Sequence, residues 1–481
     1  MNYAVIVHIT GSVLVIISLF MLPAVAVSAA YGQPDLNAMI LSAALTFCVG
    51  LLMYFRTMKN KRDSMRHRDV FLAVTLCWLM ISLFGSLPYL LSGSLESFSG
   101  AYFEAVAGFT TTGATVFSEI ESLPMGVLFW RSLTQWIGGM GIILFALAVL
   151  PFIGSGGVQL FKAEAPELTV DRLRPRIIDT AKVLWYIYAL MTAFAAILYH
   201  YGGMRWFDAV CHSFTTLATG GFSTKNASIA YYDSAFIDGV STLFMFMAGI
   251  NYTLYFNALR GDMGKFWKSS EFRFYVLVTS LAIAGVALHE LNTYGSLVNS
   301  LRYASFQVVS IITTTGFATA DYEIWSHHSQ MLLMVLMFFG GMIGSTAGGM
   351  KQVRVLLMIK QGYREIYQLI HPRAVTSLKL DGKNISKEVL GSIWGFLFLF
   401  LLICTMGMLL LSSMGVDLVT SATTVLSAIS NVGPALGDAG PTDNYSGIPD
   451  AGKWVLIFCM LAGRLEIYTV VVLLVPIFWK K

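Results

Sequence analysis

The stretch Gly108–Thr115, GFTTTGAT, places four threonines and two glycines among strongly apolar residues. Threonine is a poor helix former and glycine a worse one, so a helix that reaches this stretch is expected to end there. A close copy, IITTTGFAT, occurs much later in the chain at Ile311–Thr319. Because the copies are so alike, we expect a repeated structural element that interrupts apolar helices at corresponding places.

Composition identifies the class of protein in which these stretches occur. Of the 481 residues, 56% are hydrophobic and 12% are charged, and this charged share is about half that of a soluble domain. So few charges cannot cover a soluble surface, so the sequence predicts an all-α polytopic membrane protein. Five scattered cysteines form no CxxC pair, and neither a metal site nor a disulfide framework is expected.

Ten stretches are long and apolar enough to cross a bilayer, which takes about 20 residues. The first is interpreted as a retained helix rather than a signal peptide, because no Lys or Arg precedes Arg56. Basic residues cluster in every second connection, and by the positive-inside rule these connections and both termini are cytoplasmic. The predicted spans lie near 4–29, 37–55, 70–92, 126–153, 183–201, 235–258, 274–289, 329–350, 389–414 and 454–479.

Four of the outward connections contain an apolar segment that is too short to span. A helix of about 15 residues reaches ~22 Å, less than the ~30 Å hydrocarbon core. Because the next span runs inward, each short helix must enter from outside and return there, as a re-entrant half-helix. These segments are Ser97–Thr112, Trp206–Thr219, Leu301–Thr315 and Asp417–Val432.

The four half-helices divide most of the chain into repeats of span, half-helix, hydroxyl–glycine turn and span. The matched turn glycines are Gly113, Gly220, Gly316 and Gly433, and the fourth turn, NVGPAL, lacks the threonine run. Glu104 and Asp208 also match, and a favourable interaction with a helix N-terminus is their simplest interpretation. The predicted units are an N-terminal two-helix extension (1–69), repeat 1 (70–153), repeat 2 (183–258), repeat 3 with a broken inner helix (274–365) and repeat 4 (389–481).

Four equivalent turns suggest a four-fold arrangement around a central pore. Backbone carbonyls beyond each half-helix have no helical partner, and rings of such carbonyls can replace the water around a monovalent cation. Ordinary helix packing also uses Ser, Thr and Gly, but four matched copies favour a filter over packing alone. The candidate ion-binding residues are Thr111, Thr112, Gly113, Ala218, Thr219, Gly220, Thr314, Thr315, Gly316, Asn431, Val432 and Gly433.

With these four turns, the chain resembles the Trk/Ktr/HKT superfamily of potassium transport proteins, and its extra N-terminal spans resemble those of the bacterial TrkH subunits. The resemblance covers nearly the whole chain and implies potassium uptake across a bacterial inner membrane. Four filter glycines imply selectivity for K⁺, which is the transported ion, and no organic cofactor is expected. The resemblance also implies a TrkA-like cytosolic nucleotide-binding regulator and a homodimer, whereas no nucleic acid partner is expected.

The stretch GGMIGSTAGGMK in the third repeat is a candidate gate. Five glycines with Ser345 and Thr346 disfavour a continuous helix, although Gly340, Gly344 and Gly348 also fit the GxxxG spacing of close helix packing. The resemblance implies an intramembrane gating loop here, with Arg464 in the last span as a positive barrier. An ion pair with Glu466 or bonds to loop carbonyls would also explain Arg464. The gate candidates are Gly340, Gly341, Gly344, Ser345, Thr346, Gly348, Gly349, Lys351 and Arg464.

Two functions of other kinds fit parts of the sequence. An intramembrane enzyme could use Asp208, His212 and Ser213 as a triad, but the first repeat has no matching His or Ser, so no enzyme is expected. A symporter driven by an H⁺ or Na⁺ gradient could use the same filter, so it stays open as the alternative to gated conduction.

Overall fold

The computed structural model describes residues 1–58, 66–149, 173–374 and 376–480. In these residues the chain is helical, apart from loops and one small hairpin of β1 (Lys379–Leu380) and β2 (Lys383–Asn384). The predicted class, an all-α polytopic membrane protein, is confirmed. The end of repeat 1 and some of the basic residues of two connections fall at 59–65 and 150–172, outside the described residues.

Long apolar helices make up most of the body. In the described part of the chain, six helical stretches meet the length and hydropathy expected of a single membrane span. A further long helix, α6 (Met125–Val149), is not among these six and follows the first half-helix. The six stretches are α1 (Tyr3–Ala30), α2 (Leu36–Thr57), α3 with α4 (His67–Gly85 and Leu87–Leu91), α8 (Leu173–Tyr201), α13 (Ser270–His289) and α18 (Lys387–Ser413).

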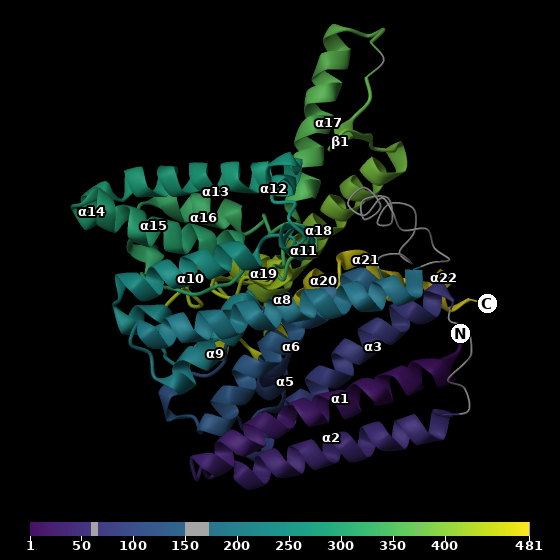
Figure 1. The fold of residues 1–481 in the computed structure, drawn as a ribbon, viewed down its shortest axis with the longest axis vertical. Helices are drawn as coiled ribbons and strands as arrows, with labels where there is room; N and C mark the ends of the chain where they lie inside the picture. Colours follow the sequence, from purple (N-terminus) through teal and green to yellow (C-terminus); the bar gives the residue numbers. More distant parts are fainter. Residues whose placement is uncertain (59–65, 150–172, 375, 481) are drawn as a thin grey trace.

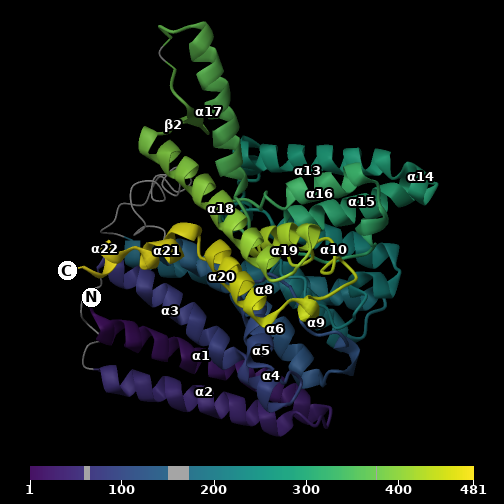
Figure 2. The ribbon, with the colours of Figure 1, turned by 180° about the vertical axis from the view of Figure 1, so that it is seen from behind.

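The two N-terminal helices pack against each other at one edge of the molecule, and α3 lies beside α1 (Figures 1 and 2). Asp35, just before α2, fastens this pair to the first repeat. Its carboxylate accepts hydrogen bonds from the Ser28 hydroxyl (2.5 Å) and from the backbone N–H of Val127 at the start of α6 (2.9 Å). Arg68 at the start of α3 donates to the carbonyl of Lys480 (2.6 Å), and the adjacent Asp69 accepts from the N–H of Asn2 (3.0 Å). Both ends of the chain therefore lie at one end of the molecule (Figure 1).

Four short helices occur where the sequence predicts half-helices. Each has 12 to 16 residues and ends three or four residues before a turn glycine with positive φ. Threonine and glycine have low helix propensity, so each helix ends where they follow its apolar residues. The half-helices are α5 (Phe98–Phe109), α9 (Trp206–Leu217), α15 (Leu297–Ile312) and α19 (Leu418–Ser430).

Three inner spans are broken, and two of these breaks correct the sequence prediction. The predicted span 235–258 consists of α10 (Ala235–Ala248) and α11 (Tyr252–Leu259), which meet at 93°. The predicted span 454–479 is bent by 119° between α20 (Asp450–Arg464) and the helical segment that begins with α21 (Ile467–Val471) (Figure 2). In the third repeat a loop separates α16 (His327–Leu336) from α17 (Gln352–Ile370), as the glycine-rich stretch predicts.

α17 projects away from the body of the molecule, and the chain returns beside it to the small hairpin, where Leu380 packs with Val353 and Leu357 near the start of α17 (Figure 1). Shorter helices complete the connections: α12 (Gly264–Lys268), α14 (Leu291–Tyr294), α22 (Pro476–Trp479), η2 (Ile120–Ser122), η5 (Ser228–Tyr232), η6 (Tyr322–Ile324), η7 (Tyr445–Gly447) and η8 (Val472–Leu474).

Candidate functional site

The turns that follow the four half-helices meet at one place. A single cleft is lined by one glycine from each turn, Gly113, Gly221, Gly316 and Gly433, together with residues of the loops that leave the turns. Four segments far apart in the sequence therefore surround a common space, as the four-fold prediction requires.

The backbone of each turn repeats one unusual pattern. Thr111, Thr219, Thr314 and Asn431 have φ between 51° and 57°, a left-handed conformation that is strained for β-branched residues in particular. The residue two positions later in each turn is a glycine with φ between 78° and 102°, and the residue between them has negative φ. Alternating hands along a strand turn successive carbonyls toward the same side.

This pattern corrects the register of the second repeat. The likeness of the four turns in sequence predicts Gly220 as the counterpart of the other turn glycines, but the positive-φ glycine is Gly221. Hydrogen bonds agree, because the Gly220 N–H donates to the carbonyl of Thr215 as the Thr112 N–H donates to that of Ala107. Gly220 is thus equivalent to Thr112, and Ala218 lies one step before the strained position. Two consecutive glycines had made both registers possible.

Each turn glycine abuts a carbonyl of the next turn, which shows the order of the ring. A Cβ atom built on Gly113 would overlap the carbonyl oxygen of Gly220. The same relation joins each repeat to the following one and the fourth back to the first. The other pairs are Gly221 with the Thr315 carbonyl, Gly316 with the Val432 carbonyl, and Gly433 with the Thr112 carbonyl. No side chain fits at these four positions unless a neighbouring strand moves.

Many carbonyls of the turns lack partners inside the protein. Within the described residues, no hydrogen bond is donated to the carbonyls of Thr111, Thr112, Thr219, Thr314, Thr315, Asn431 and Val432. All seven residues are fully buried, and a buried carbonyl without a partner is costly. A dehydrated monovalent cation on the axis would satisfy such oxygens, since carbonyl dipoles replace its hydration shell.

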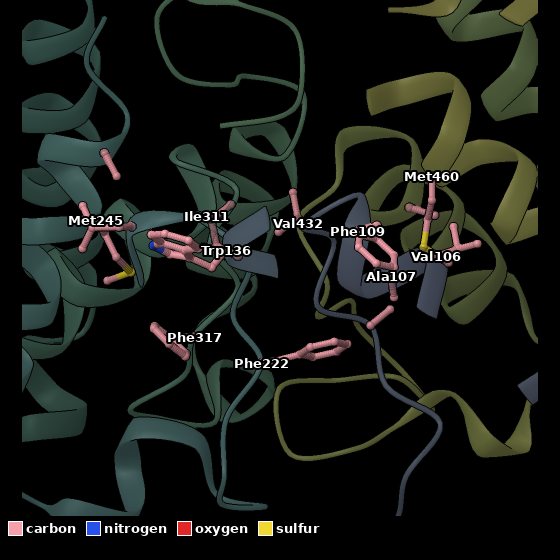
Figure 3. Close-up of a cluster of buried hydrophobic side chains, with 14 of the residues drawn as sticks. Val106, Ala107, Phe109, Trp136, Phe222, Met245, Ile311, Phe317, Val432 and Met460 are labelled. Carbon is pink, nitrogen blue, oxygen red and sulfur yellow. The ribbon is translucent and has the colours of Figure 1, made fainter. Parts of the chain in front are cut away.

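An apolar shell surrounds the turns. Figure 3 shows Phe109, Phe222, Phe317 and Val432, which come from all four repeats, among other buried apolar side chains. Phe109, Phe317 and Val432 are fully buried and Phe222 is 2% exposed. Close packing of this kind resists small displacements of the strands, because protein interiors are packed as densely as organic crystals.

The loop between α16 and α17 folds against the start of these turns. Its two ends pair with each other, since Gly340 N–H donates to the Met350 carbonyl (2.8 Å). In its middle, the Gly348 N–H donates to the hydroxyl of Thr314 (2.7 Å), and the Thr346 hydroxyl donates to the Leu217 carbonyl (3.0 Å). Hydrogen bonds of the glycine-rich segment therefore reach the second and third repeats at the turns.

The three broken spans contact one another through this loop. Met342 N–H donates to the carbonyl of Gly249 (2.9 Å), and Tyr252 N–H donates to the carbonyl of Gly344 (3.1 Å). These bonds satisfy backbone groups that the break between α10 and α11 frees. Arg464, at the end of α20, donates to the carbonyls of Thr346 (2.8 Å) and Gly138 (3.1 Å).

The gate candidates lie together, and the charged ones have specific partners. Arg464 and Lys351 are 2% and 8% exposed, and the Lys351 ammonium bonds to the Ala347 carbonyl. Glu466 pairs with Arg354 of α17 (2.5 Å) rather than with Arg464. Of the two structural explanations for Arg464, bonds to loop carbonyls are therefore the one observed. Ser345 donates to the Met342 carbonyl within the loop (2.6 Å).

Comparison with known proteins identifies the family to which the chain belongs. Residues 36–481 match the family model TrkH, described as a cation transport protein. The chain belongs to the TrkH family. The Trk system potassium uptake protein TrkH of Halomonas elongata is 42% identical to it, and that of Escherichia coli K12 is 39% identical, each over the full length of both chains. The crystal structure of the potassium transporter TrkH from Vibrio parahaemolyticus superposes with a TM-score of 0.92 at 37% identity, also over both full chains.

The enzyme alternative has no geometric support in this TrkH-family chain. One ring nitrogen of His212 faces the backbone carbonyl of Asp208 (2.8 Å) and the other faces the hydroxyl of Ser223 (2.9 Å). Ser213 donates to the carbonyl of Val210, within its own helix (2.8 Å). The relatives named above are transport proteins, which are not enzymes.

Sequence reasoning missed a buried ion pair beside the turns. Arg131 of α6 pairs with Glu104 of α5 at 2.8 Å, and both side chains are almost completely buried. Arg131 also donates to the carbonyl of Ser223 in the second repeat (3.2 Å). Glu104 accepts from the hydroxyl of Thr115 (3.0 Å) and the N–H of Val116 (2.9 Å), so it holds the loop after the first turn and lies within its helix rather than at the start. An arginine inside an apolar span was the signal available.

Glu104→Gln is expected to destabilise the folded protein by about 3–5 kcal/mol, because Arg131 would remain buried without its counter-charge. The measurement is thermal unfolding of the purified protein in detergent. Glu104→Gln combined with Arg131→Met removes both charges and should recover part of the loss. A single variant as stable as the original protein would contradict this role for the pair.

Proposed function

We propose that this TrkH-family chain takes up K⁺ across the bacterial inner membrane through the ring of four turns. The observation that carries the proposal is the ring of buried carbonyls without partners at equivalent positions of four repeats. The printed names of its full-length relatives, potassium uptake proteins, agree with it. K⁺ is the cargo here, and the proposed ligands are backbone oxygens of the turns.

The proposed filter consists of the predicted turn residues, with Gly221 added as the equivalent of Gly113. Selectivity is proposed to come from carbonyl dipoles, because the predicted filter residues include no acidic side chain of the kind that rings in other cation pores use. The adjoining loops hold both signs of charge, since Lys225 and Asp443 also line the cleft.

The loop between α16 and α17 is proposed as the gate, with Arg464 as a positive barrier beside it. A buried guanidinium near the ion path disfavours cations, and its bonds to Thr346 and Gly138 fix the loop in place. Opening would then require these bonds to break. Each is a hydrogen bond from a charged donor, worth roughly 1.5–3 kcal/mol net.

Further proposals concern assembly and orientation. We propose both termini and the basic connections on the cytoplasmic side, where a TrkA-like nucleotide-binding regulator would dock, and a homodimer as the assembled form. Both termini lie at one end of the molecule, which supports the first of these proposals (Figures 1 and 2). The division of the chain at 1–69, 70–153, 183–258, 274–365 and 389–481 is likewise proposed, on the positions of the four half-helices.

Flux through the purified protein in planar bilayers or liposomes tests the proposed function. With unequal K⁺ and Na⁺ on the two sides, the reversal potential is expected to follow the K⁺ gradient, and open events are expected to pass ions at near-diffusional rates. A reversal potential at zero would contradict K⁺ selectivity. Slow flux that stops when an H⁺ or Na⁺ gradient is removed would instead establish the coupled symporter.

A further inference from the structure

The first and third turns are braced by pairs of threonine side chains. Thr110 and Thr112 share a hydrogen bond between their hydroxyls (2.8 Å), and Thr313 and Thr315 do the same (2.8 Å). Each pair links the end of the half-helix to the residue just before the turn glycine. The pairs are fully buried, so no water competes for these bonds.

The second turn has no such pair. In the corrected register, its residues at the two positions are Ala218 and Gly220, and neither carries a hydroxyl. The fourth turn also lacks the pair. There, the amide of Asn431 donates to the Met460 carbonyl (3.0 Å) and to the hydroxyl of Thr112 (2.9 Å). The second turn therefore needs a brace from elsewhere.

Gln135 of α6 occupies the place of the missing side chain. Its amide nitrogen donates to the Gly220 carbonyl (2.7 Å), and its amide oxygen accepts from the Phe222 N–H (3.0 Å). Gln135 is fully buried. A Cβ atom built on Gly220 would overlap the amide carbon of Gln135, so the glutamine fills the volume that a threonine side chain at 220 would enter.

We propose that Gln135 is a specificity-determining positioning residue, whose amide replaces the threonine pair that the second turn lacks. The Gly220 carbonyl is one of the four that abut the turn glycines, so Gln135 fixes one quarter of the ring. The ring selects K⁺ over the smaller Na⁺ only while every carbonyl oxygen is held at the distance that suits K⁺. A carbonyl that loses its hydrogen bond can move inward and bind Na⁺ as well. This inference rests on the proposed potassium function.

The first test replaces Gln135 by Met, which has similar length and no hydrogen-bonding amide. The K⁺/Na⁺ permeability ratio, measured from reversal potentials, is expected to fall about tenfold, because Met makes neither of the two hydrogen bonds of the Gln135 amide. The unmodified protein in the same assay tests the proposed function separately. If it does not select K⁺, the proposed function fails, whereas an unchanged ratio in a folded Gln135→Met variant overturns the role of Gln135.

The second test moves the brace back into the turn. Gln135→Ala combined with Ala218→Thr and Gly220→Thr copies the first turn, and Gly220 has a negative φ that threonine accepts. This triple variant is expected to regain a permeability ratio within about twofold of the original protein, whereas Gln135→Ala alone stays low. A residue that only packs α6 would not be rescued by two threonines on another element. A folded triple variant with a low ratio therefore overturns the proposal, even if the single variants fail to fold.

Discussion

Gly221→Ser is expected to lower the K⁺/Na⁺ permeability ratio more than tenfold. A side chain at 221 meets the Thr315 carbonyl and the backbone of Gly316, which cannot move without shifting the third strand of the proposed filter. The left-handed conformation adds a cost of about 1–2 kcal/mol for any residue other than glycine. Both effects act on the ring itself, so selectivity should fall before folding fails. Reversal potentials measured across liposomes or bilayers give the ratio.

Gly220→Ser is the matched control, one residue away and chemically the same change. Its Cβ atom meets the amide end of Gln135 instead of backbone, and its φ is negative. We therefore expect a smaller loss of the K⁺/Na⁺ ratio than at Gly221, because the end of a side chain moves aside more easily than backbone. Gly113→Ser should resemble Gly221→Ser, because both glycines have positive φ near 80°. A larger effect at 220 than at 221 would contradict the register found in the structure.

Arg464→Gln is expected to raise K⁺ flux about tenfold in the absence of any regulator. A unit charge on the order of 10 Å from an ion contributes roughly 1–2 kcal/mol at an effective dielectric constant of about 20. Its removal lowers the barrier by a similar amount. The substitution also weakens the bonds by which Arg464 links Thr346 of the loop to Gly138 of α6. Rubidium or potassium uptake into liposomes measures the change.

Arg464→Lys separates the charge from the hydrogen bonds. Lysine keeps the charge but cannot reach two carbonyls with a planar fork. If the charge forms the barrier, flux should stay near that of the original protein, and if the loop bonds form it, flux should rise as in Arg464→Gln. A fall in flux in Arg464→Gln, with the protein folded, would contradict the proposed barrier.

The half-helices were predictable because hydropathy, length and composition change together at their ends. α5, α9 and α19 end within about three residues of the predicted positions, and α15 begins earlier than predicted, at Leu297. Local preferences decide such ends, since threonine and glycine terminate helices without help from distant residues. The glycine-rich break before α17 was predictable for the same reason.

The bends at α10–α11 and α20–α21 were not predictable from local sequence. Their residues are apolar enough for a continuous span, and the sequences MAGIN and LAGRLE contain no proline. The break near Gly249 forms because its freed backbone groups find partners at Met342 and Gly344, far along the chain. Tertiary contacts of this kind override helix propensity and leave no local signal.

The sequence predicted that these four turns form the candidate site, but it did not predict all of their backbone geometry and contacts. The turns of four repeats do converge, yet the role of Gly221 and the brace from Gln135 depend on backbone geometry. The threonines of the turns are among the predicted ion-binding residues. In the structure, Thr111, Thr219 and Thr314 adopt the strained left-handed conformation, and the Thr314 hydroxyl accepts a hydrogen bond from the loop.

A single polypeptide supplies all four strands of the ring, so any substitution enters the ring once. In an assembly of identical subunits the same change would appear in every quarter simultaneously. Here the four glycines with positive φ, Gly113, Gly221, Gly316 and Gly433, can be altered singly, in pairs or together. Ion selectivity can therefore be measured as the ring is changed at one, two, three or all four of its glycines. In evolution, mutation could likewise change each quarter of the ring separately.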